Sequence, residues 1–391
     1  IAEQISKPKS VNVITYFEHH NRAISFFGDM HPDFSGNVVK AMASSKKGYP
    51  IINQVLSKSQ KLSDISKDEF FKKVNKEFTA KIVAINKLTE TIVEVIIDAP
   101  LAAKNFKPGQ FYRLQNFATT APIRSGTKLA MEGIALTGAS VIGNHISLIV
   151  LEMGGSSNIC HLLQPNEEVI LMGPTGMPTE ILKNKTILLA GGGLGNAVLF
   201  SIGKAFKQAG SKILYFAAYK KTSDLYKITE IEEASDEIIW SFEQQGDFVA
   251  NRIQDKVFKG NIIEAMQAYV VGDLGEQQIK FSDIDHIIAI GSDAMMKAVK
   301  IAKNSQLKEK FSRNPTAIAS INSPMQCMMK EVCASCLQKH IDPKTGKEYF
   351  VYSCFNQDQN MDSVCFTNLG DRLKQNSLQE NITKLWLNHI L

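Results

Sequence analysis

Residues 186–196 read TILLAGGGLGN, and this stretch decides how the middle of the chain folds. The apolar run over 186–190 is typical of a buried parallel strand, and an apolar-faced helix is predicted over 197–207. The glycines between them are Gly191, Gly192, Gly193 and Gly195. Such a turn lets the backbone approach a pyrophosphate, whose charge the helix N-terminus favours. We therefore predict a dinucleotide site, although Asn196 or Ala197 stands where the full G-x-G-x-x-G fingerprint ends.

The alternation of strands and helices continues downstream. Strands are predicted over 213–218 and 286–290, and a helix over 294–302. This order predicts a parallel, doubly wound sheet, with ligands bound past the carboxyl ends of its strands. Gly291 and Ser292 form a second turn, which either faces the same nicotinamide or is an ordinary loop. The stretch over 222–278 is less regular, and we expect an insertion there.

Upstream, the pattern changes to that of β-structure. Short segments rich in β-branched and aromatic residues are separated by turns such as Lys107-Pro108-Gly109. The predicted strands cover residues 78–85, 91–97, 110–115, 133–139, 145–151 and 168–172. Short strands at this spacing favour an antiparallel barrel. The fold class is therefore multidomain: an antiparallel β-barrel followed by an α/β doubly wound domain.

The cysteines give the sharpest local signal, because five of the six lie from Cys327 onward. Cys327, Cys333 and Cys336 form C-x5-C-x2-C, and Cys354 follows at a distance. This spacing differs by a single residue from the plant-type pattern of [2Fe–2S] ligands. Zinc is the alternative, since four thiolates also satisfy tetrahedral Zn²⁺, but zinc sites usually use two C-x2-C pairs. Cys365 is an alternative to Cys354.

Composition narrows the classes of function. The 391 residues are 44% hydrophobic and 21% charged, which is typical of a soluble globular protein with two or three domains. The net charge of +5 comes from scattered lysines, so we expect no nucleic-acid site. We also expect no membrane span and no secretory signal. Clustered cysteines then favour a metal site in a cytoplasmic protein. Cys160 is expected to be a buried thiol, and no catalytic acid or base is predicted.

The order of these parts resembles the ferredoxin–NADP reductase superfamily, with the closest match to the electron transfer subunit of dihydroorotate dehydrogenase. The flavin subunit of NADH-dependent ferredoxin:NADP oxidoreductase is similar too. The resemblance covers about residues 75–356. Its motifs are Pro108-Gly109-Gln110-Phe111, Gly154-Gly155-Ser156-Ser157, Gly173-Pro174-Thr175-Gly176, Gly191–Gly195 and Gly291–Met296.

The resemblance implies three cofactors or substrates. The amides and hydroxyls of Gly154, Gly155, Ser156 and Ser157 would approach the diphosphate of FAD, with FMN as an alternative. NAD(P)H, as substrate, would bind at Gly191, Gly192, Gly193 and Gly195, with Gly291 and Ser292 nearby. A [2Fe–2S] cluster would be held by Cys327, Cys333, Cys336 and Cys354.

One departure from the family concerns the flavin. The family motif R-x-[YF]-[ST] gives an Arg to a flavin phosphate and an aromatic side chain to the isoalloxazine ring. Here the stretch reads EGIALT from Glu132 onward, without Arg. Ile134 and Ala135 would then lie beside the flavin, and Glu132 would repel a phosphate. Arg113 and Arg124 are the candidates to compensate.

Electron transfer between NAD(P)H and a protein partner, through flavin and cluster, is the function that the resemblance implies. The partner would be a redox protein or a catalytic subunit, within a hetero-oligomer or a larger fusion. Lys220 and Lys221 would favour NADPH over NADH, or they are simply solvated. The alternative function is a non-catalytic subunit of the same fold that has lost its flavin and binds zinc at the cysteines.

The expected domains are an N-terminal arm or linker over 1–74, a flavin-binding barrel over 75–180, an NAD(P)-binding domain over 181–312, and an iron–sulfur domain with a polar tail over 313–391. Within the arm, a short helix is predicted over 37–44 and a linker over 58–73. The arm resembles the linker of modules fused behind a glutamate-synthase-small-subunit-like flavoprotein. Since Ile1 stands where Met would begin a chain, we expect a longer fusion.

Overall fold

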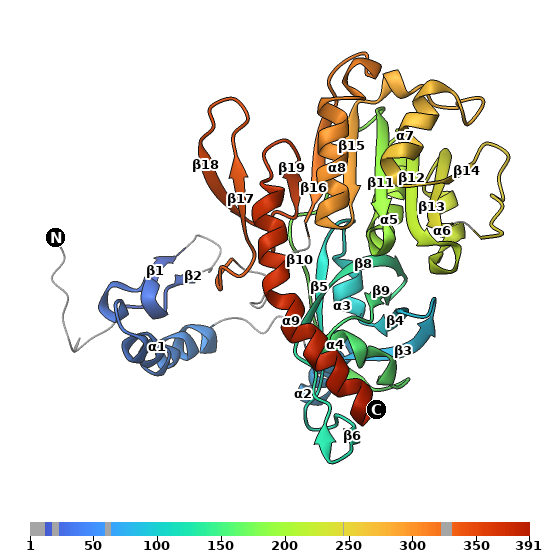
Figure 1. The fold of residues 1–391 in the computed structure, drawn as a ribbon. Coiled ribbons are helices and arrows are strands. Elements are labelled where there is room, and N and C mark those ends of the chain that lie inside the picture. Colours follow the sequence, from blue (N-terminus) through green and yellow to red (C-terminus); the bar gives the residue numbers. More distant parts are fainter. Residues whose placement is uncertain (1–11, 18–22, 59–63, 245, 322–330) are drawn as a thin grey trace. The chain divides into compact units, whose positions relative to one another are not determined.

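The computed structural model describes residues 12–17, 23–58, 64–244, 246–321 and 331–391 (Figure 1). The chain divides into two compact units, residues 1–72 and 73–391. Cys327, one of the four predicted cluster ligands, lies outside the described residues.

The first unit contains one long helix, α1 (Val38–Ser57). Asn37 caps this helix, because its side-chain oxygen accepts a hydrogen bond from the Val39 amide at 2.8 Å. Strands β1 (Ile14–Phe17) and β2 (Ala23–Ser25) pair antiparallel, and two 3-10 turns, η1 (Gly28–Met30) and η2 (Pro32–Phe34), follow. The helix predicted over 37–44 is present but longer. The helix continues through Gly48 and Pro50, which have low helix propensity, and the Phe27 ring packs directly on Gly48.

The predicted linker over 58–73 was partly wrong, because it contains the first half of helix α2 (Lys67–Phe78). Ser66 and Glu69 form a capping box: the Glu69 carboxylate accepts from the Ser66 amide at 3.0 Å, and the Ser66 hydroxyl accepts from the Glu69 amide at 3.2 Å. The helix continues through Phe78. The first barrel strand therefore begins at Ala80 rather than at residue 78.

The barrel of the second unit confirms the predicted antiparallel architecture. Its strands are β3 (Ala80–Lys87), β4 (Ile92–Asp98), β5 (Phe111–Asn116), β8 (Ile134–Ile142), β9 (His145–Leu151) and β10 (Glu168–Thr175). They close in the order β10-β3-β4-β9-β8-β5. Helices α3 (Pro100–Lys104) and α4 (Gly155–Asn158) and a small hairpin, β6 (Ile123–Arg124) and β7 (Thr127–Lys128), complete it. Val93, Val95 and Ile97 of β4 are fully buried in its core.

The α/β domain confirms the doubly wound sheet. Its parallel strands are β11 (Thr186–Gly192), β12 (Lys212–Lys221), β13 (Glu237–Gln244), β14 (Lys256–Lys259), β15 (His286–Ile290) and β16 (Thr316–Ser320). They lie in the order β14-β13-β12-β11-β15-β16. Helices α5 (Asn196–Gln208) and α6 (Ile228–Glu233) pack in one core, and α7 (Ile262–Val271) and α8 (Asp293–Asn304) in the other.

The insertion expected over 222–278 was wrong. This stretch supplies α6, β13, β14 and α7, which extend the sheet by two strands. The apolar run of β13 is fully buried over Ile238–Ser241. Asn261 and Glu264 cap α7 reciprocally, and Gly272 ends it in the left-handed conformation. The sequence of this stretch therefore contains capping signals for its helices. The polar loop between β13 and β14 interrupts the alternation of strands and helices, so the alternation was not recognised.

The C-terminal region was expected to end in a polar tail, but it ends in a long helix, α9 (Phe366–Ile390). Before it come the hairpin β17 (Leu337–Ile341) and β18 (Glu348–Tyr352), and β19 (Asp358–Asn360), which pairs antiparallel with β16. Leu369 joins the core of the α/β domain, whereas Leu387 joins the barrel core. In the described part of the chain, the helices lack the apolar length that a bilayer crossing requires.

A half-buried ion pair joins the barrel to the α/β domain. The Lys227 ammonium lies 2.9 Å from the carboxylate of Glu94 on β4. Ser147 also donates to this carboxylate at 2.5 Å, and Asn86 donates at 3.1 Å. Burial raises the pKa of the Glu94 carboxyl, but these hydrogen bonds and the Lys227 charge outweigh it, so that the pKa is lowered.

We predict that stability falls in acid because of His286, which is 8% exposed. Burial lowers the pKa of its imidazole from 6.5 to about 4. Between these values the unfolded chain binds a proton that the folded chain does not. The free energy of unfolding should therefore decrease as the pH falls from 6.5 to about 4, by about 3 kcal/mol in total.

Urea unfolding at several pH values measures this effect. His286→Gln should flatten the profile in this window, whereas His145→Gln, which changes an exposed ring on β9, should leave it unchanged. An unaltered slope in the His286 variant would assign the acid sensitivity to other groups.

Candidate functional site

The two glycine turns of the α/β domain lie side by side at the carboxyl ends of adjacent strands. β11 pairs with β15, and Gly191 lies opposite Ile290. A Cβ built on Gly192 would lie 3.7 Å from the Cα of Gly291 and 2.5 Å from the sulfur of Met295. The structure therefore brings together the two turns that the sequence assigned to one ligand. Their ligand itself stays a prediction.

Two glycines of the first turn are needed for different reasons. A Cβ on Gly195 would lie only 2.0 Å from the carbonyl oxygen of Ile290, so no larger residue fits between the two strand ends. Gly193 has φ 53°, and a Cβ built there would meet open space. Gly195 thus permits close packing, whereas Gly193 supplies a backbone conformation beside an open surface, where a ligand can approach.

Asn196, at the end of the incomplete fingerprint, stabilises the glycine turn through hydrogen bonds of its side chain. Its fully buried amide donates to the Gly193 carbonyl at 3.1 Å and accepts from the Tyr215 hydroxyl at 3.0 Å. Tyr226 also donates to the Gly193 carbonyl, at 3.0 Å. Burial raises the pKa of the Tyr226 phenol, which keeps the donating proton in place. Sequence reasoning missed both tyrosines, because they come from distant segments.

The ends of β12 and β15 place the remaining nucleotide-site candidates. Lys220 and Lys221 are exposed at the carboxyl end of β12, the strand next to β11. Ser292 caps α8 by accepting a hydrogen bond from the Met295 amide at 3.2 Å. All of these residues lie at the same edge of the sheet, where doubly wound folds bind their ligands.

The glycine-and-serine turn of the barrel has the backbone expected for close approach to a ligand. Gly154 adopts φ 104°, which side-chain-bearing residues rarely adopt. The Ser157 hydroxyl donates to the Met153 carbonyl at 2.8 Å, and the Ser156 hydroxyl accepts from the Glu132 amide at 2.8 Å. The turn is therefore ordered by its own hydroxyls.

Helix α9 covers this turn, which the sequence did not predict. The Gly155 amide donates to the Glu380 carboxylate at 2.8 Å. A Cβ built on Gly154 would lie 1.9 Å from the same carboxylate oxygen, and one on Gly155 would lie 3.1 Å from the Thr383 methyl group. The carboxylate of Glu380 thus accepts the hydrogen bond of the Gly155 amide, which the resemblance assigns to a flavin phosphate.

The flavin therefore fits this site only in part. Ile134 and Ala135 lie on β8, and Ala135 pairs with Arg113 on β5. The Arg113 guanidinium packs so closely on Gly133 that a Cβ there would lie 1.9 Å from its Nε. The positive charge of Arg113 therefore lies beside Gly133, the residue that follows Glu132 in the sequence. The backbone suits a diphosphate, but with α9 in this position the Gly155 amide is not available to one.

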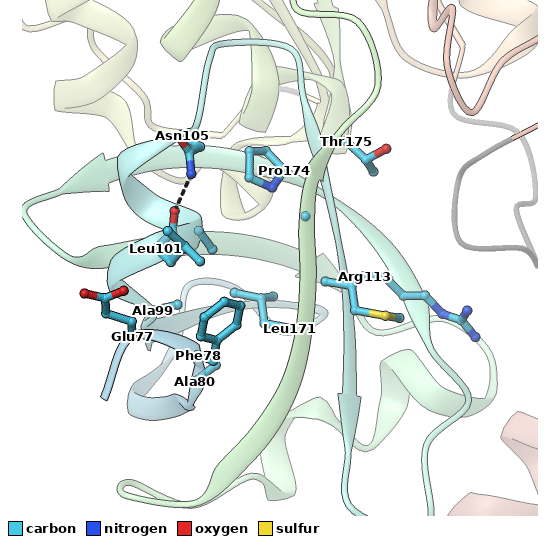
Figure 2. A pocket seen from close by; sticks show the side chains of 13 residues that line it. Glu77, Phe78, Ala80, Ala99, Leu101, Asn105, Arg113, Leu171, Pro174 and Thr175 are labelled. Carbon is cyan, nitrogen blue, oxygen red and sulfur yellow. Dashed lines mark hydrogen bonds between the residues drawn. The ribbon is translucent and has the colours of Figure 1, made fainter. Parts of the chain in front are cut away.

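A separate cavity of about 410 Å³ lies on the barrel between the end of α2, α3 and β10 (Figure 2). Its lining is mainly apolar and includes Phe78, Leu101, Leu171 and Pro174. Arg113 reaches its edge. The turns at Gly154–Ser157, Gly191–Gly195 and Gly291–Ser292 are absent from this lining, whereas Gly173, Pro174 and Thr175 belong to it.

The structure brings together two of the four predicted cluster ligands. Cys336 and Cys354 are buried and pack with Phe111 of the barrel, and the Ser353 amide donates to the Cys336 carbonyl at 3.1 Å. Cys333 is exposed on the same loop as Cys336. Among the described residues, no three His, Cys, Asp or Glu side chains are arranged to hold a metal ion. With Cys327 outside those residues, the four-cysteine set stays a prediction.

The other cysteines have distinct surroundings. Cys365 is partly buried at the start of α9, where its amide donates to the Lys339 carbonyl at 3.0 Å. Cys160 is fully buried in the barrel core, as expected. Burial, and secondarily the charge of Glu152, raises the pKa of its thiol to about 12, so that it remains an unreactive thiol.

Comparisons with known proteins point in one direction, although no protein-family model matches the sequence. The chain is 33% identical over 361 residues to Uncharacterized protein RP006 of Rickettsia prowazekii, covering 92% of this chain and 41% of that protein. It is 29% identical over 161 residues to a homolog of the electron transfer subunit of dihydroorotate dehydrogenase B (NAD(+)) in Thermotoga maritima, covering 41% and 54%. The chain thus spans less than two thirds of either relative.

Two further comparisons extend over most of the partner's length. The electron transfer subunit of Streptococcus pneumoniae dihydroorotate dehydrogenase B is 22% identical over 270 residues, which cover 68% of this chain and 91% of that subunit. A solved structure of NADH-dependent reduced ferredoxin-NADP oxidoreductase matches with a TM-score of 0.62 and 24% identity, covering 78% of this chain and 97% of that one. The second unit therefore has the fold of the ferredoxin–NADP reductase superfamily, and its sequence is related to the electron transfer subunits of dihydroorotate dehydrogenase B.

Proposed function

We propose that this chain is an oxidoreductase module that transfers electrons between NAD(P)H and a protein partner by way of a flavin. The observation that carries the proposal is the pair of glycine turns, Gly191–Gly195 and Gly291–Ser292, in contact beside a closed barrel. In doubly wound sheets this edge binds dinucleotides. The sequence relationship to electron transfer subunits supports the same role.

The roles of the residues follow from their positions. The first turn would hold the pyrophosphate of NAD(P)H, and Gly291 and Ser292 would lie near its nicotinamide. Gly154, Gly155, Ser156 and Ser157, with Ile134 and Ala135, would hold FAD or FMN once α9 leaves the turn. A bound flavin exchanges two-electron hydride chemistry for single electrons. No side chain is assigned as a general acid or base.

The [2Fe–2S] cluster is the proposed outlet for single electrons. Its ligands would be Cys327, Cys333, Cys336 and Cys354. The support is that Cys336 and Cys354 are buried together against Phe111, the first residue of barrel strand β5. A cluster there would lie next to the flavin domain. The partner would be a redox protein or a catalytic subunit, in a hetero-oligomer or a larger fusion.

A second candidate function is a non-catalytic subunit that has lost its flavin and binds zinc at the cysteines. The specific observation in its favour is the Glu380 carboxylate on the Gly155 amide. Glu132, in the stretch where the family carries Arg, also favours a subunit without flavin, because its negative charge would repel a flavin phosphate. The nucleotide turns of the α/β domain count against it, because Gly193 keeps a left-handed backbone beside an open surface, which packing alone does not require.

The absorption spectrum of anaerobically purified protein separates the two functions. We expect flavin bands and cluster shoulders for the redox module, and a colourless, zinc-containing protein for the alternative. Cys333→Ser should abolish the cluster absorption but leave flavin reduction by NAD(P)H measurable, since the two centres have separate ligands. Cys160→Ala, which removes a thiol outside the set, should retain both. Loss of flavin together with the cluster in Cys333→Ser would contradict the separation of roles.

The choice of nucleotide can be tested at the carboxyl end of β12. If Lys220 or Lys221 meets the 2′-phosphate of NADPH, Lys→Glu at that position should lower kcat/KM for NADPH about tenfold while NADH is little affected. Lys212→Glu, an equal charge change at the opposite end of the same strand, is the matched control. An unchanged ratio of the two nucleotides in both variants would mean that these lysines are merely solvated.

A further inference from the structure

Helix α9 contacts α8 of the α/β domain and α4 of the barrel (Figure 1). Near its start, Gly370 faces the N-terminus of α8, since a Cβ built there would lie 2.8 Å from the Asp293 carboxylate. Near its end, Leu387 is 3% exposed in the barrel core, and the Ser125 hydroxyl donates to the Ile390 carbonyl at 3.3 Å. The helix is thus anchored on both domains, with the Gly154–Ser157 turn beneath its middle.

The contact at this turn is that of an anion with a backbone amide. The Gly155 amide donates to Glu380 at 2.8 Å, and the same carboxylate oxygen fills the space that a side chain on Gly154 would need. Thr383, one helical turn later, closes over Gly155. A phosphate oxygen and this carboxylate oxygen need the same donor, and two negative charges repel each other at hydrogen-bond distance. The turn therefore accepts one or the other.

The middle of α9 is held much less firmly than its ends. Arg372 donates to the Ser335 carbonyl and Leu373 packs on the α/β core. Between Leu373 and Leu387, however, no residue whose side chain is described is buried. Leu378, Ile382 and Leu385 are 68%, 58% and 70% exposed, so they add little to the attachment. The Glu380 carboxylate is itself exposed to solvent. Water can therefore replace this contact without disruption of either core.

We propose that α9 is an internal competitor of the flavin, in which Glu380 stands in for a flavin phosphate at the Gly154–Ser157 turn. The inference rests on the proposed flavin site. In the closed state the helix occupies the turn, and the diphosphate binds only when the middle of α9 moves away. The occupancy of the flavin site is then set by the position of α9, and not by the barrel alone.

Titration of the flavin-free full chain with FAD, followed by flavin fluorescence, tests the proposal. Glu380→Ala removes the competing carboxylate and should lower the Kd for FAD about tenfold. Asp371→Ala is the matched control, since it removes an acidic side chain that is 64% exposed on the same helix and pairs only with Lys374, at 3.6 Å, among the contacts described for its carboxylate. It should leave the Kd within about twofold of the wild-type value. Equal gains in both variants would overturn the inference, because general electrostatics would then explain them.

A reversible tether supplies a second, independent test. A Cβ on Gly155 would lie 3.9 Å from the Cβ of Thr383, which is within the range of a disulfide. The double variant Gly155→Cys/Thr383→Cys should therefore cross-link on oxidation and hold α9 closed. FAD binding should then be weaker in the oxidised than in the reduced form of the same double variant. Gly155→Cys alone, oxidised and reduced in the same way, controls for the native cysteines and for the substitution in the turn. FAD binding by the cross-linked protein as tight as by its reduced form would overturn the proposal.

The outcomes separate this inference from the proposed function. If the wild type binds FAD and Glu380→Ala binds it no more tightly, the flavin function stands and the competitor role of α9 fails. If no variant binds FAD, the flavin function itself fails, and the competitor role fails with it. A tighter complex in Glu380→Ala alone, with weaker binding on cross-linking, supports both.

Discussion

The close approach of two strand ends, β11 and β15, is the constraint on which the second unit depends. The turn that follows β11 lies so near the end of β15 that the carbonyl oxygen of Ile290 occupies the space of a side chain on Gly195. This contact forms only if the two strands are neighbours, and parallel neighbours require the crossover segments between them to pack on the faces of the sheet. The glycine turn, the strand order and the two helical layers therefore depend on one another. Together they place both glycine turns at the carboxyl edge of the sheet.

The barrel is positioned on this sheet by a polar contact as well as an apolar one. Lys227 adopts φ 51°, which costs conformational energy for a residue with a side chain. It is held there by ion pairs of 2.9 Å to Glu94 of the barrel and to Glu230 of α6. A half-buried ion pair contributes little net stability, since desolvation offsets its attraction, but it disfavours other arrangements of the two domains. The placement of the barrel on the sheet is therefore defined before any ligand binds.

The strand and helix patterns of apolar residues predicted most of this fold. Particular residues show which parts these patterns could not predict. Buried parallel strands such as β11 and half-buried barrel strands such as β3 have distinct patterns, so both sheets were found. Helix α9 was missed because its apolar residues serve two different cores and solvent, and no single stripe results: Leu369 packs on one domain, Leu387 on the other, and Leu378 on neither. The contact of Gly155 with Glu380 joins positions 225 residues apart, which no local pattern can reveal. Asn196 was read as a missing glycine, whereas its amide supports the turn.

The contact between Glu380 and the Gly155 amide is weak, but it can still control access of a ligand to the Gly154–Ser157 turn. The stretch from Glu132 lacks the family Arg, although Arg113 lies against Gly133. The Gly154–Ser157 turn itself offers an anion backbone amides and hydroxyls, and an exposed carboxylate on one of these amides gains little in water. Glu380, however, belongs to the same chain and is held near the turn by the anchored ends of α9, so its effective concentration is on the order of millimolar or above. A free flavin at micromolar concentration must exceed this advantage through its ring contacts with the barrel. Because Ile134 stands where the family motif provides an aromatic side chain, those contacts would be smaller here. Hence the resting position of α9, rather than the intrinsic affinity of the turn, determines whether the site is open.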